Sequence, residues 1–355
     1  MIDRQFINNL SPVEVEFLSG YIYSLTTSKI KDDIDNHENL DSKLSCCPKC
    51  KSTKYIKFGH NPKHRQKYKC KECLGIFVST TNTIFSKSKI NYNDWTTFIA
   101  SEINGLTLQQ ESIQISRSVT TCFNMRHKLY RAIEEMVESQ ILKEEVKFDC
   151  TYQKINLKGT KPKNMPRISK NRGKSDKHKS IKGVSHHKIC IFTAADSNDN
   201  IITKIAGLGS EDYKKLIPFK RYFQKGSTII ADSKSSNTKF IKLIKCNYDL
   251  IPSKKHLSKK GNHISEINQI HSDLKQLNRA KKGISTRHLP DYLNWYCFLK
   301  KLIYHIETKR RKVQTYMDIM PSKKELINQD ICKIPMPINL FEAYKEYHYG
   351  IYANT

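Results

Sequence analysis

Residues 144–152 have the sequence EEVKFDCTY, in which apolar and polar side chains alternate. This period of two predicts a β-strand that carries Asp149. A second strand-like stretch, residues 227–233 with the sequence STIIADS, contains Asp232 at its end. Asn268 lies further along, in the helical stretch HISEINQIHSDLKQL. Oxygen ligands from two strands and a helix are what a divalent-metal site for phosphodiester cleavage requires, although each residue alone is more simply a turn, strand-end or exposed helix residue.

Strand and helix patterns alternate around these residues. The predicted strands are 146–152, 187–194, 201–208, 228–232 and 248–252, and the predicted helices are 211–223, 237–245 and 265–281. This order is typical of an α/β domain built on a mixed sheet, which we assign to residues 145–300. In the last helix four apolar residues form a buried stripe: Ile267, Ile270, Leu274 and Leu277. Asn268, His271, Ser272 and Lys275 lie on an adjoining polar stripe that could face metal and phosphate.

Four cysteines upstream have the spacing of a metal site. Cys47 and Cys50 form one Cys-x-x-Cys pair, and Cys70 and Cys73 form a second. Two such pairs bring four thiolates to one point, which predicts a structural Zn²⁺ in a zinc ribbon at residues 44–80. Two unrelated cysteine pairs or a redox pair are the alternatives. Cys46 is an alternative ligand, but Cys47 has the better spacing.

Residues 81–140 are predicted to form a helical module. Thr107 and Gln110 match a capping box, and the helix after Ser116 is apolar on one side and basic on the other. Two helices joined by a short turn resemble a helix-turn-helix, which would contact DNA through Arg126, Lys128 and Arg131. An ordinary small helical bundle is the alternative.

The charge of the chain indicates a polyanionic partner. The 355 residues contain 62 Lys and Arg against 34 Asp and Glu, a formal net charge of +28. Such a charge favours nucleic acid over the alternatives of a merely soluble basic protein or a ribosome-associated one. Residues 158–188 hold eleven Lys and Arg and one acid, Asp176. We interpret this insertion as a DNA-binding arm rather than a solvated loop, with Arg167, Arg172 and Lys174 as contacts, joined by Lys275 from the polar stripe.

The rest of the sequence sets the cellular context. No apolar run approaches the ~20 residues that span a bilayer, and the N-terminus lacks a signal-peptide pattern. The eleven cysteines do not form a disulfide framework, so we expect a reducing cytoplasm. We also expect association with the nucleoid. Residues 1–43 are predicted to be a helix and linker, and residues 301–355 a helical tail.

These stretches together resemble bacterial insertion-sequence transposases of the 1595-type family. The resemblance runs from about residue 47 to 300, over the cysteine pairs, TNTIF (81–85), DCTY (149–152), GSTIIAD (226–232), HISEIN (263–268) and the RHL and YL that follow. Many relatives have glutamate where this chain has Cys150, and several subgroups have glutamate where it has Asn268. The spacing of 36 suits the asparagine-bearing subgroup, and Glu266 would point to a different helix face.

The resemblance implies a ribonuclease-H-like catalytic domain with Asp149, Asp232 and Asn268 as its triad. Two Mg²⁺ or Mn²⁺ ions would be the cofactors. The expected activity is that of a DNA transposase, which binds terminal inverted repeats in double-stranded DNA, cleaves the ends and joins them to target DNA. Such a reaction needs a homodimer or larger assembly on DNA. The alternatives are a DNA-binding regulator or a domesticated relative that no longer cuts, and a metal-dependent nuclease of the same fold.

Overall fold

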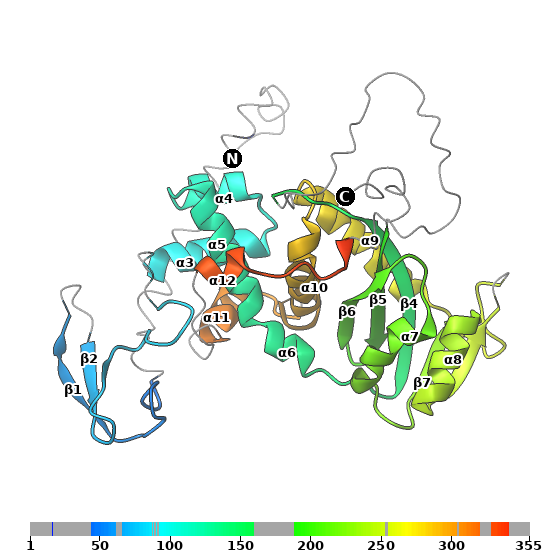
Figure 1. Cartoon of the computed structure of the whole chain (residues 1–355), viewed down its shortest axis with the longest axis horizontal. Helices are drawn as coiled ribbons and strands as arrows, with labels where there is room; N and C mark the ends of the chain where they lie inside the picture. The colour runs from blue at the N-terminus through cyan, green and yellow to red at the C-terminus, as the bar shows by residue number, and fades with distance from the viewer. Residues whose placement is uncertain are drawn as a thin grey trace, which may run out of the picture. The chain divides into compact units, whose positions relative to one another are not determined.

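The structure of the protein is a computed structural model that describes residues 16, 44–61, 66–86, 88, 90, 92–159, 188–252, 255–303, 305–319 and 328–340. They form two compact units (Figure 1). The first holds the described residues up to Ala132 together with Ile306–Cys332, and the second holds Ile133–His305 and the described residues from Lys333. No helix among the described residues has the length and apolar character to cross a membrane.

A five-stranded sheet forms the centre of the second unit. Its strands are β4 (Glu145–Lys154), β5 (Lys188–Asp196), β6 (Ile201–Leu208), β7 (Thr228–Asp232) and β8 (Asn247–Ile251), in the order β6-β5-β4-β7-β8. β6, β5 and β4 are antiparallel neighbours, whereas β4, β7 and β8 are parallel. This mixed sheet with flanking helices is the ribonuclease-H-like fold, as predicted.

Helices cover both faces of the sheet. α7 (Tyr213–Leu216), the 3-10 helix η2 (Ile217–Tyr222) and α8 (Ser235–Ile244) pack on one face, where Phe148, Phe192 and Phe240 lie in a common apolar core. α9 (Ser265–Ala280) packs on β4 and β5, and α10 (Leu289–Phe298) packs on β6 from the face to which Thr203 points. α6 (Glu134–Glu138), η3 (Thr286–His288) and the π-helical turn Leu299–Ile303 complete this unit.

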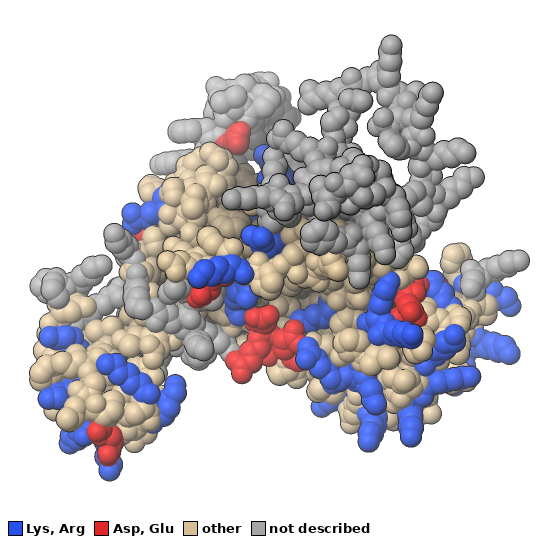
Figure 2. Space-filling view, viewed as in Figure 1, with Lys and Arg blue, Asp and Glu red and all other residues tan. Residues whose placement is uncertain are grey.

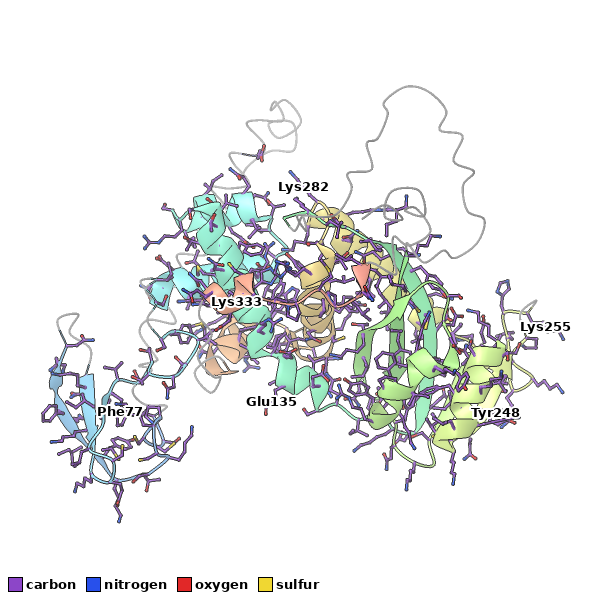
Figure 3. The ribbon with its side chains drawn as sticks, viewed as in Figure 1. Phe77, Glu135, Tyr248, Lys255, Lys282 and Lys333 are labelled. Carbon is purple, nitrogen blue, oxygen red and sulfur yellow. The ribbon has the colours of Figure 1, made fainter. Side chains whose placement is uncertain are left out.

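The first unit contains a zinc-ribbon-like sheet and a helical group. The antiparallel strands are β1 (Tyr55–His60), β2 (Gln66–Cys70) and β3 (Ile76–Phe77). Tyr55, Tyr68 and Phe77 form their small core, with ring centroids 5.5–5.8 Å apart. Phe77 is labelled in Figure 3. The helices are α3 (Tyr92–Ile103), α4 (Leu108–Gln114), α5 (Val119–Ala132), α11 (Lys309–Ile319) and α12 (Asn328–Cys332).

The predicted elements are recovered with small shifts. The strands 201–208 and 228–232 have the predicted bounds, and the Thr107–Gln110 capping box is present at the start of α4. The predicted helix 211–223 is instead a short α-helix followed by a 3-10 helix, with Pro218 at the start of the latter. The boundary between the two units follows Ala132, whereas the sequence suggested a boundary near 140. Residues 306–332 belong to the first unit, whereas the sequence suggested a separate tail. Nearly all of the predicted N-terminal helix and linker, residues 1–43, and of the basic insertion lies outside the described residues.

Candidate active site and zinc centre

Strand register brings Asp149 and Asp232 together. The parallel pairs between β4 and β7 run from Glu145–Thr228 to Lys147–Ile230, a constant offset of 83 (228 − 145 = 83). Asp149 and Asp232 have the same offset (232 − 149 = 83), so they are opposite one another when that register is extended by two residues. Their neighbours Phe148 and Ala231 lie in the core on the α7–α8 face, and alternation therefore turns both aspartates to the α9 face.

Both carboxylates converge on one lysine. The Nζ atom of Lys234 lies 3.4 Å from Oδ1 of Asp149 and 3.7 Å from Oδ2 of Asp232. It also lies 2.9 Å from Oε1 of Glu211, a residue just before α7 whose side chain is almost fully buried. Three carboxylates around a single cationic group form a set of hard oxygen donors, which is the chemistry that Mg²⁺ and Mn²⁺ prefer. The residues present therefore fit a divalent cation.

Charge and burial act in opposition at this site. Desolvation raises the pKa of Asp149, and the ammonium of Lys234 opposes that rise. Desolvation would lower the pKa of Lys234, but the attraction of Asp149 and Glu211 outweighs it and raises that pKa. The two effects keep the lysine charged and held among the carboxylates, so a metal ion at the same point would compete with its ammonium.

α9 packs on the face of the sheet to which strand alternation turns the two aspartates. Nζ of Lys147 donates to Oε1 of Glu266 at 3.1 Å, and Nε2 of Gln153 donates to Oδ1 of Asn278 at 3.4 Å. Lys147 and Gln153 are on the same side of β4 as Asp149, so the helix extends along that strand past the aspartate. Ile267 and Ile270 are buried as predicted, and Asn268 is exposed beside them.

The two flanks of α9 are distinguishable by their surroundings. His271 lies on one flank, where desolvation lowers its pKa to about 4 and the charges of Lys275 and Lys234 lower it further. On a helical wheel Asn268 falls on this flank, together with Lys275, whereas Glu266 falls on the other and bonds to Lys147. Asn268 is exposed on the flank of His271, whereas Glu266 is engaged by Lys147.

Cys150 does not belong to this site. It is buried among the apolar residues on the α7–α8 side of β4, because successive side chains on a strand point to opposite faces. A thiol therefore serves as a small core group at this position.

The four predicted zinc ligands lie together in the ribbon. Their sulfur atoms are all within 4.8 Å of one another, with Cys47 Sγ 3.8 Å from Cys73 Sγ and Cys50 Sγ 3.5 Å from Cys70 Sγ. Four thiolates at ~2.3 Å from a tetrahedral ion would be about 3.8 Å apart, so the donor set fits Zn²⁺. Lys51 and Leu74 follow the two pairs with left-handed φ values of 65° and 55°, so the two turns have matching backbones.

Hydrogen bonding favours the thiolate at Cys70, whereas desolvation and hydrogen bonds from the other three cysteines raise the pKa of Cys50 to about 12. The backbone N–H of Cys73 lowers the pKa of the Cys70 thiol to about 6, against a smaller opposing effect of desolvation. A thiol of low pKa is readily available as the thiolate that Zn²⁺ requires.

Cys47→Ser is expected to remove one equivalent of zinc per chain, because the tetrahedral set then lacks a ligand. Cys46→Ser is the matched control, since Cys46 is outside the sulfur cluster, and it should keep its zinc. Elemental analysis of the purified full chain measures both. Equal zinc loss in the two variants would show that Cys46 serves as a ligand.

The proposed DNA contacts on α5 need correction. Arg126 is only 2% exposed, and its guanidinium pairs with Glu102 of α3 and Glu111 of α4, so it is not available to DNA. Lys128 is 9% exposed and Arg131 is half-buried, because α5 is enclosed beyond its first turn. Ser118, Val119 and Thr120, at the start of the helix, are exposed instead. Lys275 is exposed, and Arg167, Arg172 and Lys174 lie outside the described residues.

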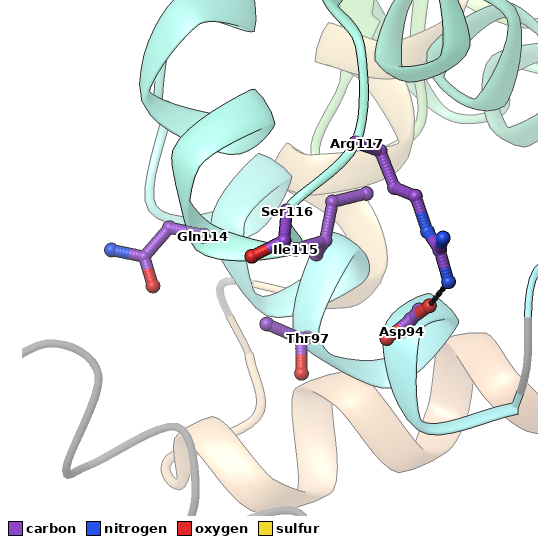
Figure 4. A pocket seen from close by; sticks show the side chains of 6 residues that line it. All are labelled: Asp94, Thr97, Gln114, Ile115, Ser116 and Arg117. Atoms are coloured by element: carbon purple, nitrogen blue, oxygen red, sulfur yellow. Dashed lines mark hydrogen bonds and ion pairs between the residues drawn. The ribbon is translucent and has the colours of Figure 1, made fainter.

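A polar pocket of about 330 Å³ lies at the turn between α4 and α5 (Figure 4). Six residues line it: Asp94, Thr97, Gln114, Ile115, Ser116 and Arg117. The Nη2 atom of Arg117 lies 2.8 Å from Oδ2 of Asp94, an ion pair that ties the turn to α3. The lining includes none of the residues around Lys234, and the pocket is therefore separate from the candidate active site.

Part of the chain is similar in sequence to a protein of a transposable element. A protein described as "uncharacterized protein in transposable element ISH50", from Halobacterium salinarum, is 26% identical over 151 residues, which is 42% of this chain and 49% of that protein. The matched part thus spans about half the length of this relative, which is archaeal, so the relationship is not restricted to bacteria.

Solved structures and a family profile give further matches. The Mos1 strand transfer complex is 12% identical, with a TM-score of 0.26, over 68% of this chain and 81% of that chain. The Mos1 mariner paired end complex with Mn is 13% identical, with a TM-score of 0.22, over 65% and 80% respectively. Residues 141–300, which include β4 to α10 and both aspartates, match the profile of the ISXO2-like transposase domain.

Proposed function

We propose that the chain is a metal-dependent DNA transposase that cleaves the ends of its element and joins the freed 3′-hydroxyl to target DNA. The observation that supports the proposal is that the carboxylates of Asp149 and Asp232 lie 3.4 and 3.7 Å from the Nζ atom of Lys234. The two aspartates share the offset of the β4–β7 register and lie inside the segment similar to ISXO2-like transposase domains. A DNA-binding protein without phosphoryl-transfer chemistry has no need of such a pair.

Asp149 and Asp232 would hold the divalent ions, and Asn268 would add an amide oxygen. When bound, the ions neutralise charge at the phosphate and make the attacking oxygen more acidic. An amide oxygen is neutral and a weaker ligand than a carboxylate, so the metal ion that Asn268 would help to hold is bound less tightly. Glu211 provides a third buried carboxylate, which holds Lys234 against the pair.

Both steps are in-line displacements at phosphorus. Water attacks the bond at the element end, and the resulting 3′-hydroxyl attacks a target phosphodiester. In each step a new P–O bond forms while the 3′-oxygen of the broken P–O bond leaves as an alkoxide and takes up a proton, so no enzyme-bound intermediate forms. Two ends are used together, which implies a dimer or larger assembly on DNA.

The test incubates the full chain with plasmid DNA that carries matched terminal inverted repeats. We expect Mg²⁺-dependent nicks at the repeat ends, followed by strand-transfer products in a second plasmid. Binding to the repeats with no nick in Mg²⁺ or Mn²⁺ would identify a regulator or an inactive relative. Nicks without joined products would identify a nuclease of the same fold.

A further inference from the structure

The face of the second unit formed by α7 and α8 is strongly basic. Residues 213–248 contain nine Lys and Arg, and Asp232, at the candidate active site, is the only acid among them. Figure 2 shows Lys and Arg side chains gathered over this part of the molecule. None of these residues was among the DNA contacts predicted from sequence.

Three of the nine cations form ion pairs or hydrogen bonds through their side chains in the structure. Lys234 is held by the carboxylates, Arg221 pairs with Glu138, and Nζ of Lys215 donates to the carbonyls of Leu208 and Ser210. The other six are exposed and form no ion pair with any carboxylate in the described part of the chain. They are Lys214, Lys220, Lys225, Lys239, Lys242 and Lys245.

The exposed side of α8 leads away from the candidate active site. Ser235, Lys239 and Lys242 are exposed at spacings of four and three residues, so they form one stripe, while Asn237, Phe240 and Ile241 are buried. The helix begins directly after Lys234, and with a rise of ~1.5 Å per residue the stripe extends about 10 Å from that end. Lys239 lies over the ring of Tyr213 of α7, so α7 and α8 are in contact here. Lys214 follows Tyr213 in α7 and is exposed.

We infer that Lys214, Lys239 and Lys242, the α8 basic surface, bind the phosphates of a DNA duplex irrespective of its sequence. Their spare positive charge complements a polyanion, and the stripe starts where phosphodiester chemistry is proposed. All three are lysines, which bind phosphate as point charges, whereas bases are read mainly by the forked groups of Arg, Asn and Gln. A sequence-independent contact suits the target DNA of the transposition reaction, and that assignment rests on the proposed function.

The test is salt-dependent binding of an unrelated duplex of 20–30 base pairs to the full chain, by fluorescence anisotropy in EDTA. For Lys214→Gln/Lys239→Gln/Lys242→Gln we expect affinity to fall at least about tenfold in ~0.1 M salt, and the log–log salt slope to fall by up to about 2.7. The matched control replaces three exposed lysines elsewhere in the same unit with Gln, namely Lys143, Lys282 and Lys333 (the last two are labelled in Figure 3). It removes the same charge and should keep most of the affinity and slope.

The outcomes separate this inference from the proposed function. Equal losses in the two triple variants would overturn it, because only net charge would then matter. Unchanged DNA affinity together with lost binding to phosphatidylserine vesicles would overturn it in favour of a membrane. If the triple variant does not fold, Lys239→Gln and Lys242→Gln alone should each lower the slope by about 0.9. Nicking of the inverted repeats by the wild-type chain is measured independently of all these results.

Discussion

Asp149→Asn and Asp232→Asn are each expected to lower strand transfer by about a thousandfold or more. Charge stabilisation by a catalytic metal ion contributes several kcal/mol to the transition state, and each ~1.4 kcal/mol corresponds to a factor of ten. Either substitution replaces a charged ligand with a neutral one of the same shape. Each should also weaken Mn²⁺ binding in calorimetry, a measurement that does not depend on turnover.

Asp199→Asn is the matched control for both variants. Asp199 is an exposed carboxylate in the turn between β5 and β6, with a φ of 58° that asparagine adopts readily. We expect its strand transfer and Mn²⁺ affinity to be close to wild type. Wild-type strand transfer by either the Asp149 or the Asp232 variant would contradict the assigned site, as would unaltered Mn²⁺ binding in both.

The two aspartates of the proposed catalytic pair could be located on strands because local patterns mark those strands. Strand periodicity located β4 and β7 and showed that each presents an aspartate. Their common offset, however, is a property of register, which arises from pairing in three dimensions and not from either strand alone. The sequence therefore suggested that the aspartates meet, and the structure links them through a shared contact with Lys234.

Glu211 and Lys234 were not predicted because no local signal marks them. Glu211 stood at the start of a predicted helix, and Lys234 was one cation among many in a basic chain. Their importance comes from a contact between loops after β6 and β7. Contacts of this kind depend on how the strands are ordered in the sheet, and single-sequence patterns do not contain that information.

Arg126 is a different case, since the sequence did hold a usable signal. Cys122, Arg126, Leu129 and Ile133 have the spacing of one helical stripe, and the other three are apolar and buried. A cation within an apolar stripe needs a buried acid, and Glu102 and Glu111 in the two preceding helices supply it. Grouping Arg126 with the basic residues of α5 by charge alone obscured this pattern.

Arg126→Ala is accordingly expected to destabilise the first unit by about 3–5 kcal/mol, because it leaves two fully buried carboxylates without their counterion. The guanidinium also donates to the carbonyl of Leu106 at 3.1 Å, so the three helices α3, α4 and α5 lose a shared contact. Urea unfolding followed by the fluorescence of Trp95, in a Trp295→Phe background, reports on this unit.

Arg117→Ala provides the control, because it removes an ion pair with Asp94 in which the arginine is 41% exposed. Exposed pairs contribute at most about 1 kcal/mol, so this variant should unfold close to wild type. Arg126→Lys should be intermediate, since it keeps the charge and loses the fork that reaches two carboxylates at once. If Arg126→Ala kept full stability and instead lost affinity for duplex DNA, the arginine would be a DNA contact after all, and the buried network would have no structural role.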